Sequence, residues 1–165
     1  MSAVMVVPSP DEAPSLEYRP LMERDLATVA AIEASAYVFP WTMGNFRDSL
    51  LSGYQCIGCW TGHELIGYAI VMTALEEAHL LNLAVASGWQ RRGVGAQFVQ
   101  HLIGGVRKQG LEMLYLEVRP SNVAARRMYE RFGFRQLGLR RDYYPSLNGR
   151  EDALFLGLNL APQLI

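Results

Sequence analysis

The spacing of apolar residues along the chain predicts four helices. Apolar side chains recur every three or four positions, the period of a helix with one buried face, in residues 23–37, 41–51, 93–109 and 121–132. Thr42 and Ser121 are the expected N-caps of the second and fourth helices, because a hydroxyl there can accept a hydrogen bond from a free backbone N–H. Gly110 and Gly133 are the expected stop signals of the third and fourth.

Shorter apolar or alternating runs predict seven strands, in residues 16–20, 54–60, 64–73, 78–85, 113–118, 134–139 and 153–160. Residues 140–152 read as a loop between the last two of them. The order of elements is therefore β-α-α-β-β-β-α-β-α-β-β. This order predicts an α/β fold in which a mixed sheet of about seven strands is flanked by helices on both faces.

The composition fits one domain. A chain of 165 residues with 50% apolar content can bury one core of ordinary size, since domains usually have about 100–150 residues. We expect a flexible leader over residues 1–15 and a single domain over residues 16–165. The net charge of −1 provides no overall field to hold nucleic acid or an anionic membrane. We therefore expect a cytoplasmic protein with no membrane and no direct nucleic-acid partner, whose oligomeric state the sequence leaves unknown.

Cys56 and Cys59 have the C-x-x-C spacing found in redox pairs and in halves of zinc sites. A structural zinc site needs four ligands, and the histidines of this chain are scattered at His63, His79 and His101. A redox pair favours the start of a helix, whereas the segment around these cysteines reads as a strand. We therefore expect two reduced thiols and no metal site.

The stretch most informative about chemistry is Gln-Arg-Arg-Gly-Val-Gly-Ala, residues 90–96, between the strand that ends at Val85 and the third helix. Glycines there let backbone amides converge, and a helix start carries about half a positive charge. Such a turn binds an anion, typically phosphate, although it can also be only a tight connection. Phe98 replaces the third glycine of a dinucleotide fingerprint, and no Gly-Lys-Ser/Thr of a P-loop follows.

This stretch resembles the Gln/Arg-x-x-Gly-x-Gly/Ala signature of the GNAT acetyltransferases, and the similarity extends over residues 16–160. The resemblance implies that acetyl-CoA is the co-substrate. It implies that the pyrophosphate is held by Arg91, Arg92, Gly93, Val94, Gly95 and Ala96. It also implies that the pantetheine arm lies along the backbone of Leu83, Ala84 and Val85, where a backbone N–H near Val85 would polarise the acetyl carbonyl.

Three further stretches, residues 39–41, 116–122 and 141–153, resemble one type within this family, the ribosomal-protein alanine N-acetyltransferases of RimI type. The acceptor of that type is the N-terminal alanine of small-subunit ribosomal protein number eighteen. The resemblance therefore implies that the partner is a protein N-terminus, flanked by residues 37–41 and 140–152. The residues that follow the N-terminus of this acceptor are basic, and Glu76 and Glu77 are weak candidates for binding them.

Glu117 and Tyr129 are the candidate catalytic residues. Glu117 stands in an otherwise apolar strand, where a carboxylate is costly unless it serves a partner or opens onto a cleft. Tyr129 follows Asn122 by seven residues, almost two helical turns, so both share one helix face. The resemblance implies that Glu117 is the general base, that Tyr129 protonates the departing CoA thiolate, and that Asn122 binds the pantetheine region.

Both candidate residues can also be purely structural. Tyr129 could be a packed aromatic residue of the core, and Glu117 could be the structural partner of Arg119 or of an arginine in a neighbouring strand. The same cofactor pattern would suit a GNAT that acetylates protein lysines or a small amine. It would also suit a non-catalytic acyl-CoA-binding module, but the presence of both Glu117 and Tyr129 argues against that function.

Overall fold

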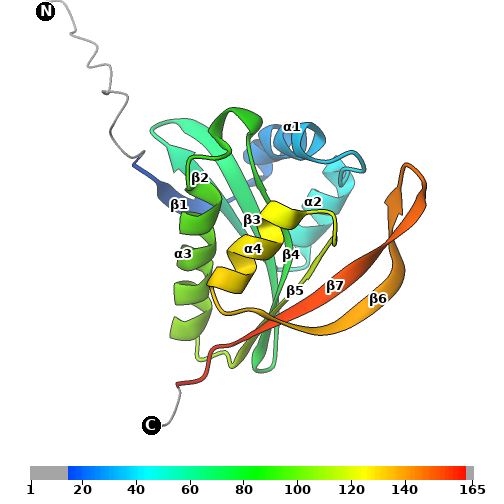
Figure 1. Cartoon of the computed structure of the whole chain (residues 1–165). Helices are drawn as coiled ribbons and strands as arrows, with labels where there is room; N and C mark the ends of the chain where they lie inside the picture. Colours follow the sequence, from blue (N-terminus) through cyan, green and yellow to red (C-terminus); the bar gives the residue numbers. More distant parts are fainter. Residues whose placement is uncertain (1–14, 163–165) are drawn as a thin grey trace, which may run out of the picture.

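The computed structural model describes residues 15–162 and contains four α-helices and a seven-stranded sheet (Figure 1). The strands are β1 (Glu17–Pro20), β2 (Gln55–Thr61), β3 (Glu64–Ala74), β4 (Glu77–Val85), β5 (Met113–Val118), β6 (Arg135–Ser146) and β7 (Gly149–Asn159). The helices are α1 (Leu26–Ala36), α2 (Met43–Leu51), α3 (Val94–Lys108) and α4 (Val123–Arg131), with short 3-10 turns at Glu23–Asp25 and Ser87–Trp89. The predicted order of elements is confirmed. The expected leader lies outside the described residues except for Ser15.

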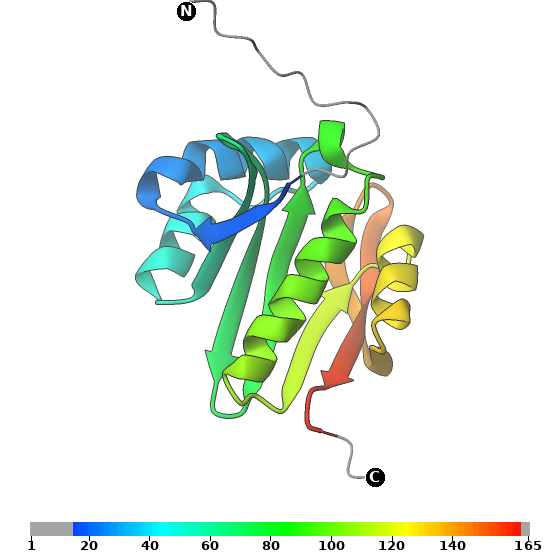
Figure 2. The same ribbon diagram turned by 90° about the vertical axis from the view of Figure 1, so that its left-hand side faces the viewer.

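The sheet is mixed, and helices cover both of its faces, as predicted. The strand order is β1-β2-β3-β4-β5-β7-β6, in which only β4 and β5 are parallel neighbours. Helices α1 and α2 pack on one face, and α3 and α4 on the other (Figure 2). Each face has its own buried cluster, so the sheet separates two cores.

The apolar stripes seen in the sequence are the surfaces that the helices bury. In α3, Val94, Phe98, Leu102 and Val106 are all less than 5% exposed, and burying a side chain of this size contributes about 1.5–3 kcal/mol. The predicted cap of α2 is confirmed, because the Thr42 hydroxyl accepts a hydrogen bond from the backbone N–H of Asn45 at 3.2 Å. Tertiary burial and local capping therefore both stabilise the helices that the sequence predicts.

A β-bulge at Leu81 divides β4 into two parts. Leu80 pairs with Val71 of β3 and Asn82 with Ile70, so Leu81 is an extra residue. Side chains change faces across this bulge: Leu80 points into the core under α3, whereas Asn82 and Ala84 point toward α1. Pairing of β4 with β5 also ends here, because Leu80 with Leu116 is the last pair. Beyond Leu80, the two parallel strands separate and leave the sheet open.

Two details of the sequence prediction are wrong. The N-cap of α4 is Asn122 and not Ser121, because the Asn122 side chain accepts the hydrogen bond from Ala125 N–H, while both Ser121 groups bind Glu151. Residues 140–152 are mostly strand rather than loop, since β6 and β7 continue as a paired hairpin as far as Ser146 and Gly149. Pro145 is tolerated in β6 because β6 is the edge of the sheet.

The two cysteines are free thiols within β2, and both are buried. Burial raises the pKa of each to about 11, which keeps the thiols protonated and unreactive at neutral pH. Among residues 15–162, no three His, Cys, Asp or Glu side chains come together as a metal ion would require. None of the helices described has the length and apolar character to cross a membrane.

Candidate active site

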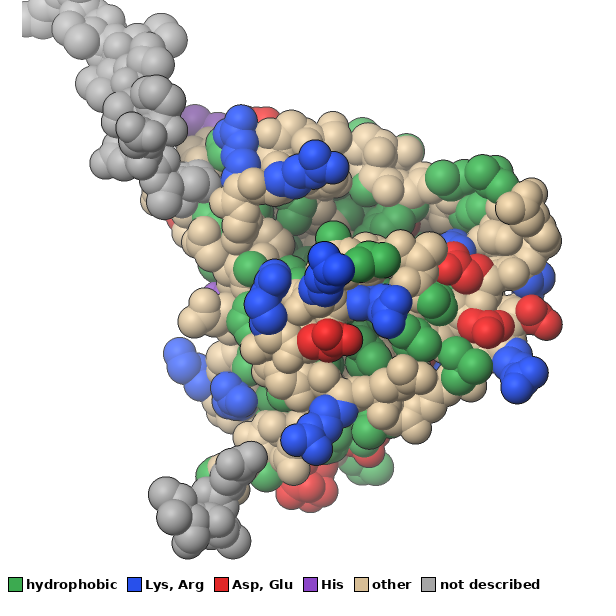
Figure 3. Space-filling view, in the orientation of Figure 1, with side chains coloured by type: hydrophobic (Ala, Val, Ile, Leu, Met, Phe, Trp, Pro, Cys, Tyr) green, Lys and Arg blue, Asp and Glu red, His purple; other side chains and the backbone are tan. Residues whose placement is uncertain are grey.

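A cleft of about 950 Å³ occupies the opening between β4 and β5. Its lining includes the last residues of both strands, the first turns of α4, the segment between α1 and α2, and the tip of the β6–β7 hairpin. Figure 3 shows hydrophobic side chains in the floor of a hollow above α4, with Lys and Arg side chains on both sides of it. The hollow therefore has an apolar floor with basic side chains above and below it in this view, while three glutamates, Glu33, Glu117 and Glu151, are among the residues that line the cleft.

The end of β4 turns backbone polar groups into this cleft. Ala86 N–H bonds to Ile66 O at 2.7 Å, and backbone groups in an antiparallel pair alternate in direction. Leu83 and Val85 therefore face away from β3, toward the opening. Their carbonyls accept hydrogen bonds from the Tyr37 hydroxyl at 2.5 Å and from Gln90 Nε2 at 2.9 Å. Ala84 also lines the cleft, but its backbone N–H and carbonyl point toward β3 and not into the opening.

The glycine-rich turn stands at the mouth of the cleft. Arg91 and Gly93 have φ angles of 62° and 78°, so both residues take the left-handed backbone conformation, which glycine adopts without strain. The amides of Val94, Gly95 and Ala96 precede the first helical hydrogen bond of α3, from Gln97 N–H to Gly93 O, and so have no partner within the helix. Gly95 lines the cleft.

The side chains of this turn differ in their surroundings. Val94 is 1% exposed and packs in the core, so it could serve a ligand only through its backbone. The Arg92 guanidinium lies over the Trp89 ring, 4.9 Å from its centre. Arg91 is exposed, and Ala96 is half-buried on α3. A bound anion would therefore meet mainly backbone N–H groups, with arginine charge beside them.

Tyr129 and Asn122 reach the cleft from α4. Tyr129 is 7% exposed and packs edge-on against Phe134, so it is a core residue as well as a lining residue. Its hydroxyl makes no hydrogen bond to residues 15–162 and is not fully buried. Burial, and then the nearby Tyr37 and Tyr144, raise the pKa of Tyr129, which keeps this hydroxyl protonated as a donor. Asn122 Oδ1 caps α4, and its amide nitrogen remains available.

Glu117 enters the cleft from the opposite face of the sheet. It alternates along β5 with Leu116 and Val118, which are buried in the core beside α3 and α4, so its side chain points to the α1 side. Its side chain is only 9% exposed, and its Oε2 lies 2.5 Å from His79 Nε2 of β4. Arg140 of β6 approaches Oε1 at 3.5 Å. Arg119, one of the two structural partners expected for Glu117, pairs with Glu151 instead. The arginine that does approach Glu117 comes from β6, which β7 separates from β5, and not from a neighbouring strand.

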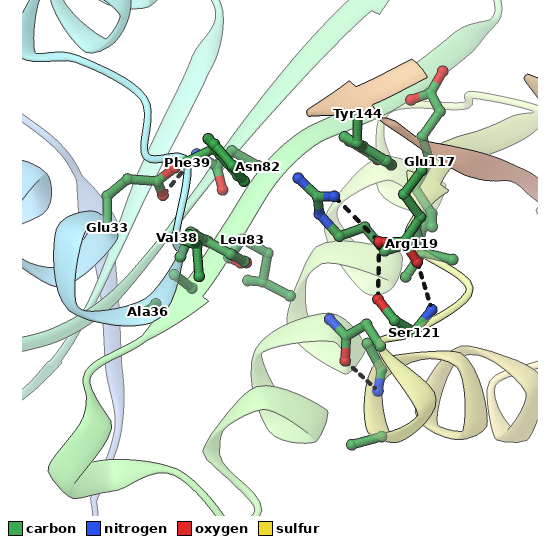
Figure 4. Close-up of a pocket in the computed structure, with 18 of the residues that line it drawn as sticks. Glu33, Ala36, Val38, Phe39, Asn82, Leu83, Glu117, Arg119, Ser121 and Tyr144 are labelled. Atoms are coloured by element: carbon green, nitrogen blue, oxygen red, sulfur yellow. Dashed lines mark hydrogen bonds and ion pairs between the residues drawn. The ribbon is translucent and has the colours of Figure 1, made fainter. Parts of the chain in front are cut away.

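The buried carboxylate of Glu33 holds one wall of the cleft. Glu33 is 2% exposed and accepts hydrogen bonds from Trp41 N–H at 2.9 Å, from Asn82 Nδ2 at 3.0 Å and from the Tyr68 hydroxyl. These bonds tie residues 37–41 to β3 and β4, and Figure 4 shows Glu33 beside Asn82. Sequence reasoning missed Glu33, although an acid four residues after Val29 interrupts the buried stripe of α1.

The opposite wall is the hairpin of β6 and β7, which Glu151 anchors. Glu151 accepts hydrogen bonds from the Ser121 N–H and hydroxyl, both at 3.0 Å, and from Arg119 at 3.2 Å. Arg119 also donates to Pro145 O and lies over the Tyr144 ring. The Ser121 hydrogen bond, above all, lowers the pKa of Glu151. Figure 4 shows this group across the opening from Glu33.

The structure does not place Glu76 and Glu77 at the cleft. Glu77 begins β4 and pairs with Met113, whereas the cleft lies at the other end of this strand, from Leu80 to Val85. This acidic pair is therefore not part of the cleft, and its role in receiving a basic segment of the acceptor stays a prediction. The two ends of β4 are separated by the length of a nine-residue strand. The sequence does not show which end of this strand faces the cleft.

The fold and the site agree with comparisons to known proteins. A model of the acetyltransferase (GNAT) family matches residues 26–134. This chain belongs to the GNAT family of acetyltransferases. Within the family it is similar to the [ribosomal protein bS18]-alanine N-acetyltransferase of Escherichia coli (strain K12), with 38% identity over 137 residues that cover 83% of this chain and 93% of the relative.

Solved structures of GNAT proteins show the same architecture. The crystal structure of the ribosomal-protein-S18-alanine N-acetyltransferase from Escherichia coli has a TM-score of 0.85 and 35% identity, and the match covers 92% of this chain and 99% of that chain. A Salmonella typhimurium protein solved with its cofactor acetyl-CoA shares the fold, with a TM-score of 0.74, 17% identity and coverage of 92% and 97%. The predicted enzyme class, an acetyl-CoA-dependent N-acetyltransferase, is confirmed.

Proposed function

We propose that this enzyme transfers the acetyl group of acetyl-CoA to the N-terminal α-amine of a protein, and that the acceptor is the N-terminal alanine of ribosomal protein bS18. The proposal rests on the relatives with this activity, which match the chain over more than four fifths of its length. The cleft supports it, because Tyr129 lines it from the α4 side and Glu117 from the α1 side. A donor and an acceptor could thus approach from opposite faces of the sheet.

The donor side fits acetyl-CoA. The free N–H groups at the start of α3 suit a pyrophosphate, and the inward N–H groups of Leu83 and Val85 suit the polar pantetheine arm, as does the free amide nitrogen of Asn122. An arm bound along β4 would end where β4 leaves β5. In that position one of the β4 N–H groups can hydrogen-bond the thioester oxygen as negative charge builds on it.

The acceptor side fits a chain terminus that enters between two anchored walls. Residues 37–41 form one wall and the hairpin around Tyr144 the other, and both carry apolar side chains at the cleft, including Val38, Phe39 and Leu147. Exposed apolar residues that face each other across a groove are unfavourable in water unless a partner covers them. The first side chains of a protein N-terminus could cover them.

Glu117 and Tyr129 supply the proton transfers. Glu117 takes a proton from the acceptor ammonium, directly or through water, so that the free amine attacks the thioester carbon. A C–N bond forms, the C–S bond breaks, and Tyr129 gives its proton to the departing sulfur. The attacking nitrogen carries a positive charge and two protons once the C–N bond has formed, and it gives one of these protons to the Tyr129 phenolate, directly or through water, so that the amide leaves neutral. The chain's residues thus remove a proton at one end of the cleft and return one at the other.

The acceptor class can be tested by mass spectrometry. Purified enzyme and acetyl-CoA are incubated with peptides that carry the bS18 N-terminal sequence, with a free or a blocked N-terminus, and with peptides that have a changed first residue. We expect the acetyl group on the free α-amine and no product from the blocked peptide. Acetylation of internal lysines in the blocked peptide would contradict the N-terminal assignment, and the absence of any CoA-dependent product would favour a binding module.

The glycine turn gives a second prediction, since Gly93 and Gly110 flank α3 with nearly equal φ angles of 78° and 76° and open space at each Cβ position. Gly93→Ala and Gly110→Ala should each cost about 1–2 kcal/mol of stability, because alanine is strained in this region. Only Gly93→Ala should also weaken CoA binding, by about tenfold, because its backbone shapes the amide turn. Calorimetry with CoA measures this, and equal affinities in the two variants would contradict the assigned turn.

A further inference from the structure

His79 lies against the proposed base without touching the cleft. Its Nε2 atom is 2.5 Å from Glu117 Oε2, whereas His79 does not belong to the cleft lining and Glu117 does. The two side chains stand on adjacent strands, in β4 just before the bulge and in β5 just beyond the last β4–β5 pair. The opening of the sheet therefore leaves Glu117 with one face toward the cleft and one toward His79.

Neighbouring side chains enclose Glu117 and His79 together. Phe155 of β7 stands directly opposite Glu117, and its ring packs near His79 and Arg140. The side chains of Glu117 and His79 are only 9% and 21% exposed, so water weakly screens the charges of the pair. The other ionisable groups that face Glu117 are Arg140 and Tyr144 of β6, while Arg119 is paired with Glu151.

We propose that His79 is the positioning residue of the general base; this rests on the proposed function of Glu117. His79 donates its Nε2–H to Glu117 Oε2, which fixes the carboxylate and leaves its other oxygen for the acceptor. Without this donor the carboxylate is free to rotate, and the oxygen that takes the proton is no longer held at the acceptor amine.

The test compares the kinetics of three variants. His79→Gln keeps an N–H donor, His79→Phe removes the donor, and His63→Gln, in an exposed turn, is the matched control. For each variant kcat and the KM for acetyl-CoA are compared with those of wild type. Thermal melting of each variant verifies that it is folded.

For His79→Gln we expect a kcat within a few-fold of wild type, because the amide N–H replaces that of the imidazole. His79→Phe should lose about tenfold in kcat with an unchanged KM for acetyl-CoA, and His63→Gln should match wild type. Full activity of His79→Phe, or a loss in His79→Gln as large as that in His79→Phe, would overturn the inference.

Failure of this inference can be distinguished from failure of the proposed function. If Glu117→Gln retains full activity, Glu117 is not the base and the proposed function needs another one. If Glu117→Gln is inactive but His79→Phe keeps full activity, only the role of His79 fails. A readout independent of turnover is the NMR signal of the His79 ring nitrogens, which should shift in Glu117→Gln and remain unchanged in His63→Gln.

Discussion

Replacement of Tyr129 by phenylalanine should reduce turnover by about 10²–10⁴-fold, the range for loss of a general acid. The substitution removes one hydroxyl and leaves the ring against Phe134, 5.4 Å away, so the core stays packed. Because the hydroxyl acts when charge builds on sulfur, kcat and kcat/KM should fall together, while the Kd for CoA changes less than about twofold. Steady-state kinetics and calorimetry measure the two quantities separately.

Tyr18→Phe is the matched control, since Tyr18 is also a tyrosine packed against a phenylalanine, Phe98, on the α3 side of the sheet, but it does not line the cleft. Its turnover should equal that of wild type. If Tyr129→Phe turned over as fast as Tyr18→Phe, Tyr129 would be only a core residue, and the proton for the thiolate would have to come from water.

Replacement of Glu33 by alanine should lower the free energy of unfolding by roughly 3–5 kcal/mol, which is the sum of a small cavity and of donors left without an acceptor. Tyr68 is 0% exposed and would keep a hydroxyl with no hydrogen bond. Burial and the Glu33 carboxylate raise the pKa of Tyr68, so Tyr68 stays a neutral donor across the usual pH range. Urea unfolding followed by tryptophan fluorescence measures the loss.

The same variant should also raise the KM for the acceptor, because Trp41 N–H loses the bond that ties residues 37–41 to the sheet. Glu23→Ala is the matched control. Glu23 is a glutamate near the start of the same helical region, 62% exposed and paired with Arg47 at the surface, where a salt bridge contributes about 0–1 kcal/mol. Equal stability of the Glu33→Ala and Glu23→Ala proteins would contradict the role of Glu33 as the acceptor that holds this wall.

Local patterns determined most of the fold and the glycine-rich turn at the mouth of the cleft. Several helix signals act over only one or two turns and can therefore be recognised in the sequence. They are the helix periodicity, the Thr42 cap and the stops at Gly110 and Gly133, and the structure agrees with them. The turn at residues 90–96 is likewise local, because a glycine pattern directly before a helix fixes where backbone amides point.

The hairpin of β6 and β7 shows where local reasoning fails. Residues 140–152 contain a proline, a glycine and charged residues that are typical of loops, yet most of them form strand because they find cross-strand partners. Strand pairing is a long-range property that propensity records poorly. The Asn122 cap was missed for a related reason, since the Ser121 hydroxyl is taken by Glu151, which is distant in the sequence.

The amino-acid sequence by itself determined the order of elements, the glycine-rich turn before α3 and the choice of Glu117 and Tyr129 as candidates. Only the tertiary structure decided that Tyr129 and Glu117 meet one cleft from opposite faces, because a bulge at Leu81 and the end of β4–β5 pairing open the sheet there. It alone brought His79 to Glu117, 38 positions apart, and Glu33 to Asn82, 49 apart. The physical reason is that hydrogen bonds and charge pairs depend on distance in space, which chain separation does not encode.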